Sequence, residues 1–261
     1  MVKTMQGGAS GSAQHIDYLL RLGDNALVLS QRLTEWVGKG PALEEDMALA
    51  NTGLDLIGQA RLWLSYAGEV EGVGRTEDQL AYLRDAHQFR NLLIVEQPNG
   101  GYADTLMRQY LFDSWHLLLL EQLTRSSDQR VAAIAEKAVK EVTYHLRRSA
   151  DLVVRLGDGN EESHQRMQTA LDELWMFTGE MFEVDSVDEI LESHGIVDSV
   201  SVLRAPWLAQ VSRTLAAATL TMPSADAWMQ EGGKQGRHGE HIGFLLAEMQ
   251  FLQRAYPGLQ W

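Results

Sequence analysis

The sequence contains no cysteine among its 261 residues. This absence excludes a disulfide framework, a thiolate metal site and a cysteine nucleophile, and it fits the reducing conditions of the cytoplasm, where we expect the protein to be located. No uninterrupted run of about 18 apolar residues occurs, so the sequence predicts no membrane-spanning helix. Positive charge is also scarce, because 22 lysines and arginines stand against 36 aspartates and glutamates. The resulting net charge of −14 argues against nucleic acids and anionic membranes as partners.

Proline is rare, and its five positions leave the whole interval between Pro98 and Pro206 open to long helices. The absence matters because proline removes an amide donor and clashes with the preceding helical turn. Turn-forming residues divide the chain into segments of helical length, and no strong run of alternating β-branched residues indicates a strand. We therefore predict an all-α protein with helices at about residues 16–37, 43–70, 77–85, 103–123, 129–156, 161–182, 200–217 and 238–255.

The beginning of the chain differs in character from the rest. Residues 1–13 contain one lysine and a run of glycine, alanine and serine, without the apolar core of a signal peptide. Segments of this composition behave as flexible coils. We predict a flexible leader over residues 1–13 and a single domain over residues 14–261.

Three of the predicted helices carry apolar stripes at helical spacing. The stripes include Leu49, Leu56 and Trp63; Leu106, Tyr110 and Leu120; and Val131, Ala138 and Val142. Such stripes are the seams of an antiparallel bundle. Short connections make hairpins of the first and last pairs of long helices, and a longer crossover at about residues 71–101 joins the hairpins. This connectivity predicts a ferritin-like four-helix bundle with additional C-terminal helices.

Polar side chains interrupt the seams at Gln59, Asp113 and His145. Burying such groups costs free energy unless they find partners. Ferritin-like bundles that hold two irons place carboxylates and Glu-x-x-His pairs at inward positions of this kind. The three residues therefore resemble an incomplete metal site, or a hydrogen-bonded cluster within the core.

Longer strings of residues point to a family. They are LRLGDN (20–25), SQRL (30–33), ALAN (48–51), GLDLIGQAR (53–61), VEQPNG (95–100), KEVTYHLR (140–147) and LAEMQ (246–250). In these strings the chain resembles the phenylacetyl-CoA epoxidase family of phenylacetate degradation, and specifically its non-catalytic, structural subunit. The resemblance extends over about residues 16–261.

The resemblance also implies where metal ligands would lie. The catalytic subunit of that family is a homologous ferritin-like chain with a complete di-iron site. Its ligand positions correspond here to Val28, Leu56, Gln59, Asp113, Val142 and His145. One carboxylate, one imidazole and one amide cannot replace the roughly six mostly anionic ligands that two irons need. We therefore expect no metal and no catalytic residue in this chain, with the di-iron centre in its partner.

Two functions are compared. The first is a structural, non-catalytic subunit of the multicomponent phenylacetyl-CoA 1,2-epoxidase that docks and stabilises the di-iron catalytic subunit, alongside other epoxidase components and a reductase. Alone, such a chain could form a homodimer. The second is an independent metal-dependent ferritin-like oxidoreductase that adds Asp55 and Glu141 to Asp113 and His145. Both added carboxylates lie one position off the seams, which argues against the second function.

A basic, glycine-rich segment stands out in this acidic protein. It covers residues 232–238 and includes Lys234, Arg237 and His238. Backbone amides in such a segment, next to a helix start, suit phosphate groups. The segment is a candidate contact either for the phosphates of coenzyme A or for a partner subunit.

Two further features have ordinary explanations. Asp113 and His116 have the spacing of a ligand pair, but His116 is rotated off the seam and is expected to pack. Seven tryptophans provide more apolar surface than one core obviously needs. Some of them could contribute to a subunit interface, although burial is the expected fate of each taken singly.

Overall fold

The computed structural model describes the backbone of residues 6–259 and the side chains of residues 12–259. The described part of the chain is helical and contains no strand, which confirms the all-α prediction. Its helices are α1 (Gln6–Thr34), α2 (Leu43–Glu71), α3 (Glu77–Tyr82), α4 (Leu93–Glu96), α5 (Tyr102–Leu123), α6 (Gln129–Gly157), α7 (Glu161–Leu174), α8 (Ser186–Ser193), α9 (Arg204–Ala217) and α10 (His241–Ala255). Short 3-10 turns η1 (Ala86–Gln88), η2 (Trp175–Phe177), η3 (Gly179–Phe182), η4 (Val200–Leu203) and η5 (Gly233–Gln235) connect some of them.

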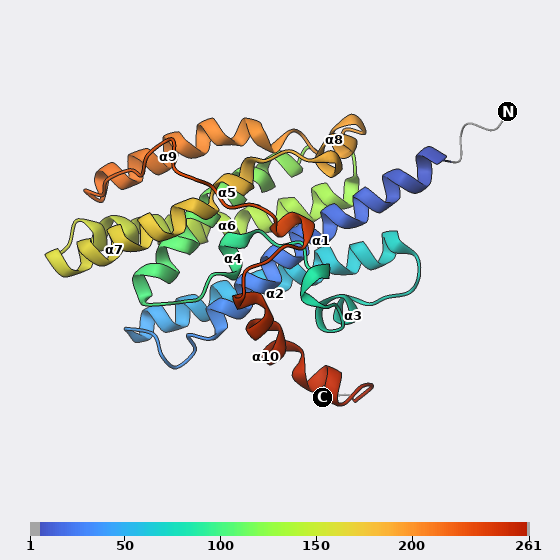
Figure 1. Cartoon of the computed structure of the whole chain (residues 1–261), viewed down its shortest axis with the longest axis horizontal. Coiled ribbons are helices and arrows are strands. Elements are labelled where there is room, and N and C mark those ends of the chain that lie inside the picture. The colour runs from blue at the N-terminus through green and yellow to red at the C-terminus, as the bar shows by residue number, and fades with distance from the viewer. Residues whose placement is uncertain (1–5, 260–261) are drawn as a thin grey trace.

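The four long helices α1, α2, α5 and α6 form the bundle as two hairpins. α1 packs along α2, and α5 packs along α6 (Figure 1). The second hairpin turns at Asp128, whose carboxylate accepts the backbone N–H groups of Arg130 and Val131 at the start of α6. An aspartate at this position satisfies amides that have no partner within the helix. The ferritin-like arrangement predicted from the seams is thereby confirmed.

Helix α1 is the centre of the molecule, because its residues are buried on all sides from Tyr18 to Leu29. Its glycine allows α2 to approach closely: a Cβ at Gly23 would lie 2.7 Å from the side chain of Leu64. Interiors this dense leave no room for an added methyl group.

The crossover between the hairpins is fixed by buried arginines. Arg84 donates to the carboxylate of Asp24 on α1, with Nη1 2.9 Å from Oδ2. Arg108 donates from Nη1 to the carbonyl oxygen of Gln97 at 2.5 Å, inside the VEQPNG string. Buried charges of this kind require close partners. The string thus has a structural role, since a buried arginine holds its backbone.

Several boundaries differ from the sequence prediction. α1 begins at Gln6, so residues 6–13 of the predicted leader are helical, while residues 1–5 lie outside the described residues. The helix predicted at 161–182 ends at Leu174 and continues as 3-10 turns. Helix α8 is absent from the sequence prediction because it is short. Its start is marked only by the cap of Asp185, which accepts the N–H groups of Val187 and Asp188.

The C-terminal helices are distributed around the bundle. α7 and α9 lie along one side of it, and α10 projects from the opposite side beside α3, at the red end of the chain (Figure 1). α10 begins at His241 rather than at residue 238. In the described part of the chain, no helix combines the length and the apolar character needed to cross a membrane.

Candidate functional site

The six positions at which the family resemblance places metal ligands all lie in the core. Val28 of α1, Leu56 of α2 and Val142 of α6 are completely buried. The polar members Gln59, Asp113 and His145 are buried as well, with 1%, 1% and 3% of their surface exposed. The seam positions Leu56, Gln59, Asp113, Val142 and His145 therefore lie in the core as the apolar stripes predict.

Asp113 links α5 to α6. Its Oδ1 accepts a hydrogen bond from Nε2 of Gln109 at 2.6 Å, and its Oδ2 accepts one from the hydroxyl of Ser149 at 3.0 Å. Burial raises the pKa of Asp113 to about 6, although the charge of His145 and both hydrogen bonds act in the opposite direction. Both carboxylate oxygens are engaged by neutral donors, so this residue is satisfied without a metal.

His145 is held by a residue outside the predicted ligand set. Its Nε2 lies 2.9 Å from Oδ2 of Asp55 on α2, and the Asp55 side chain is 42% exposed. Its other ring nitrogen, Nδ1, has no hydrogen-bond partner among the described residues. The imidazole therefore bridges α6 to the edge of α2.

Gln59 is likewise held across the seam between α2 and α6. Its Nε2 donates to Oε2 of Glu141 at 2.9 Å. Gln59, Asp113 and His145 therefore do not form the hydrogen-bonded cluster that the sequence suggested. Each of them forms its hydrogen bonds with other residues. Asp55 and Glu141 stand one position off the seams, but their side chains are long enough to reach across the helix edge.

These two pairs belong to a series of polar contacts that closes the α2–α6 seam. Nearer one end, the hydroxyl of Tyr66 donates to Asp128 at 2.5 Å. Arg130 donates from Nη1 to Glu69 at 2.7 Å. Nearer the other end, Arg148 donates to Glu45. Hydrogen bonds and ion pairs thus join α2 to α6 along their common edge.

His116 packs as expected. Its ring centroid lies 4.9 Å from that of Phe112 and 6.4 Å from that of Trp115. Burial, with the nearby charge of His145, lowers the pKa of His116 to about 3. The imidazole is therefore neutral in the folded protein, and its role is that of an aromatic core residue.

The donor set does not fit a di-iron centre. Within the described residues, no group of three or more histidine, aspartate or glutamate side chains could hold a metal ion. Three of the six corresponding positions are aliphatic and one is an amide. Carboxylate and imidazole ligands would be needed at these positions.

The glycine-rich segment 232–238 binds anions, but they belong to the chain itself. The backbone N–H groups of Gly232 and Lys234 donate to Oε1 of Glu180 at 3.0 and 3.2 Å. The N–H of Gly239 donates to Oε1 of Glu96 at 2.7 Å, and Nδ1 of His238 lies 2.7 Å from Oε2 of the same carboxylate. The amide groups that suggested a phosphate site are thus occupied by internal carboxylates.

The side chains of this segment show that most of it faces inward. Lys234 is 7% exposed, and its Nζ donates to the carbonyl oxygen of Glu183 at 2.5 Å and to Oδ2 of Asp188 at 3.3 Å. Burial opposes charge on His238, yet its hydrogen bond to Glu96 raises its pKa above the ordinary value. Arg237 alone of the three candidate residues is exposed. The internal contacts of Lys234 and His238 argue against a phosphate site made of all three residues, which stays a prediction.

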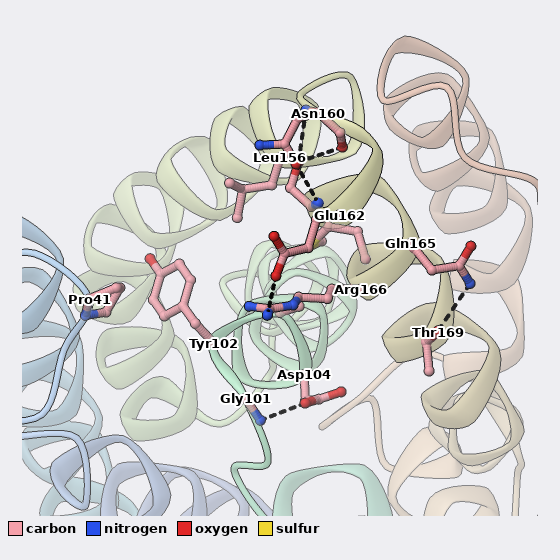
Figure 2. A pocket seen from close by; sticks show the side chains of 13 residues that line it. Pro41, Gly101, Tyr102, Asp104, Leu156, Asn160, Glu162, Gln165, Arg166 and Thr169 are labelled. Carbon is pink, nitrogen blue, oxygen red and sulfur yellow. Dashed lines mark hydrogen bonds and ion pairs between the residues drawn. The ribbon is translucent and has the colours of Figure 1, made fainter.

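A surface pocket of about 570 Å³ lies between the ends of α5, α6 and α7. Figure 2 shows Arg166 directed at Glu162 and the carboxylate of Asp104 directed at the backbone of Gly101. The polar groups of this pocket serve helix caps and an exposed ion pair. None of the six metal-ligand positions lines it.

The ferritin-like helical bundle defines a class of protein, and the comparison with known families places the chain within it. Residues 1–261 match the family described as phenylacetic acid catabolic protein, and the chain belongs to that family. It is 54% identical over 244 residues to one of the subunits of the 1,2-phenylacetyl-CoA epoxidase of Escherichia coli strain K12, covering 94% of this chain and 98% of that relative. The resemblance found in the sequence is confirmed.

Proposed function

We propose that this chain is the structural, non-catalytic subunit of a phenylacetyl-CoA 1,2-epoxidase in the cytoplasm. It docks and stabilises the homologous di-iron catalytic subunit, within a complex that includes other epoxidase components and a reductase. The observation that carries the proposal is the complete burial of Val28, Leu56 and Val142, the aliphatic residues at positions where the family resemblance places metal ligands. The E. coli relative, which is named as a subunit of that epoxidase, supports it.

The energetics of the core support the same proposal. A di-iron site requires several carboxylates to be buried, and each is stable only when metal or hydrogen bonds compensate its lost hydration. With leucine and valine at those positions, apolar packing replaces buried carboxylates there. Such a chain is free to keep the bundle shape and to supply matching surfaces to a homologous partner.

The alternative function, an independent metal-dependent oxidoreductase, has one observation in its favour. Asp55 approaches His145 to 2.9 Å, so a carboxylate and an imidazole do meet. However, the Asp55 side chain is 42% exposed at the helix edge. The Asp113 carboxylate accepts from Gln109 and Ser149 instead. These contacts favour the structural subunit.

The deciding experiment compares the chain alone with the chain in complex. We expect the isolated chain to contain iron and manganese far below one ion per chain and to leave phenylacetyl-CoA unchanged with a reductant and oxygen. Co-expression with the catalytic subunit should give a stable complex in which the catalytic subunit is more active than alone. Stoichiometric metal with turnover by the isolated chain would establish the alternative function.

A further inference from the structure

A groove runs between α2 and α3 on the outside of the bundle and encloses about 430 Å³. Leu54, Gly58 and Arg61 of α2 form one wall, and Asp78 and Tyr82 of α3 form the other. Asp78 and Tyr82 also line an adjoining hollow of about 460 Å³ that extends to residues 257–259. We call these two hollows together, from Leu54 to residue 259, the α3 groove.

The α3 groove is lined by unusually exposed apolar side chains. Leu54 is 64% exposed, and Leu83 and Leu259 at the other end are more than half exposed. A single exposed leucine is ordinary. Leu54 lines the first hollow, and Leu83 and Leu259 line the second, so both hollows present exposed apolar side chains of the kind found at interaction sites.

No contact within the described part of the chain explains why residue 58 is a glycine. Other glycines of α2 allow close internal packing. A Cβ at Gly53 would lie 3.2 Å from the side chain of Thr34, and a Cβ at Gly68 would collide with the carbonyl oxygen of Arg75. A Cβ at Gly58 would meet no described atom within 4 Å. Because glycine in a helix interior destabilises the helix relative to alanine, an approach from outside the chain is the remaining structural reason for it.

The charges around the α3 groove indicate the kind of partner. Arg61 lies 3.4 Å from Glu77 across the groove, so its charge is matched within the chain. Asp78 has no ion-pair partner among the described residues, and the whole chain carries a net charge of −14. A complementary surface therefore has an apolar centre with lysine or arginine at its rim.

We infer that a helix of the catalytic subunit packs into the α3 groove, with its backbone against Gly58, apolar side chains on Leu54 and a basic residue beside Asp78. The absence of a side chain at position 58 lets two helix axes approach more closely than usual. This inference rests on the proposed function, because it assigns the surface through which the two subunits meet.

The test uses two substitutions at one position. Gly58→Ala should raise the melting temperature of the isolated chain by about 2 to 4 °C, because the added methyl group enters open space and favours the helix. Gly58→Leu should leave the isolated chain folded but weaken its complex with the catalytic subunit about 10- to 100-fold. The matched control is Ala209→Leu, an exposed small residue of α9 on the other side of the bundle (Figure 1), which should leave affinity unchanged.

A third variant tests whether the negative charge of Asp78 attracts the catalytic subunit. Asp78→Lys should slow association with the catalytic subunit, and the effect should shrink as salt is added. Unchanged affinity in Gly58→Leu, or equal weakening by Ala209→Leu, would overturn the assignment of this surface while the proposed function stands. If the wild-type chain forms no complex, both fail. If Gly58→Leu abolishes only self-association of the isolated chain, the occupant is a second copy and the assignment to the catalytic subunit is overturned.

Discussion

Nε2 of His145 lies 2.9 Å from Oδ2 of Asp55, and this contact joins α6 to α2 at a residue that the family resemblance aligns with a metal ligand. The parallel contact of Gln59 with Glu141, at 2.9 Å, joins the same helices one turn along. Both contacts use a residue from the predicted ligand positions and a neighbour from outside that set. Gln59 and His145 thus hold two helices of the bundle together, and we expect substitutions of core residues to change the stability of the protein.

Asp113→Asn should stabilise the protein at neutral pH. The folded-state pKa of Asp113 is raised from 3.8 to about 6, so the folded chain holds a proton that the unfolded chain has released. Wild-type stability from this group is present at low pH and is lost as pH rises through about 6. Asparagine removes that loss, and we expect a gain of roughly 1 to 3 kcal/mol at pH 7. Urea unfolding at pH 7 and pH 4 checks it, with the gain vanishing at pH 4.

His116→Phe should stabilise the protein in acid. Burial lowers the folded-state pKa of His116 from 6.5 to about 3, so below pH 6.5 the unfolded chain binds a proton that the folded chain does not. Stability is therefore lost as pH falls, by about 2 kcal/mol at pH 5. Phenylalanine keeps the packing against Phe112 and removes this loss. The prediction fails if the wild type and the variant lose equal stability between pH 7 and pH 5.

Leu56→Glu should place a carboxylate, a common metal ligand, in the core without creating a metal site. Leu56 is completely buried, and a carboxylate there would lack compensating partners. We expect a loss of at least about 3 kcal/mol in the free energy of unfolding, and no bound iron. Leu54→Glu is the matched control two residues away, because Leu54 is 64% exposed. In the isolated chain it should change stability by no more than about 0.5 kcal/mol. Binding of iron by Leu56→Glu would contradict the prediction.

The variants Lys234→Met and Arg237→Ala distinguish a structural role of residues 232–238 from binding of the coenzyme A phosphates. Lys234 donates to Glu183 and Asp188 from a buried position, so its replacement should lower the melting temperature by several degrees. In the assembled epoxidase, the apparent Michaelis constant for phenylacetyl-CoA should stay unchanged. Arg237 is exposed, and its replacement should change neither quantity. A raised Michaelis constant in Arg237→Ala alone would show that this residue contacts the coenzyme.

The parts of the structure that sequence could predict are those set by local periodicity. The sequence predicts the start of α2 at residue 43 and of α6 at residue 129, as observed, because carboxylates and a capping aspartate mark these helix starts. The burial of Gln59, Asp113 and His145 followed from their place in the seams. These inferences require only the spacing of residues within one helix.

The parts that could not be predicted depend on contacts between distant segments. The composition of residues 232–238 suggested an open phosphate site, but Glu180, Glu183 and Asp188 fold beneath it from about fifty residues earlier. No pattern within residues 232–238 indicates these contacts. The contacts of Asp55 and Glu141 escape prediction for a related reason, since helical geometry gives the direction of a Cα–Cβ bond but not the reach of the side chain.

The burial of α1 on all sides has a consequence for the order in which its contacts form during synthesis. Arg21 of α1 donates to Asp185 at 2.8 Å and to Asp188 at 3.4 Å, and Lys234 donates to the same Asp188. Arg21 therefore obtains these two partners only after most of the chain has been translated, whereas Asp24 of the same helix meets Arg84 much earlier. Until then the part of α1 that packs on α8 stays uncovered, and a chain that ends before α8 leaves Arg21 with Asp17 as its carboxylate partner among the described residues.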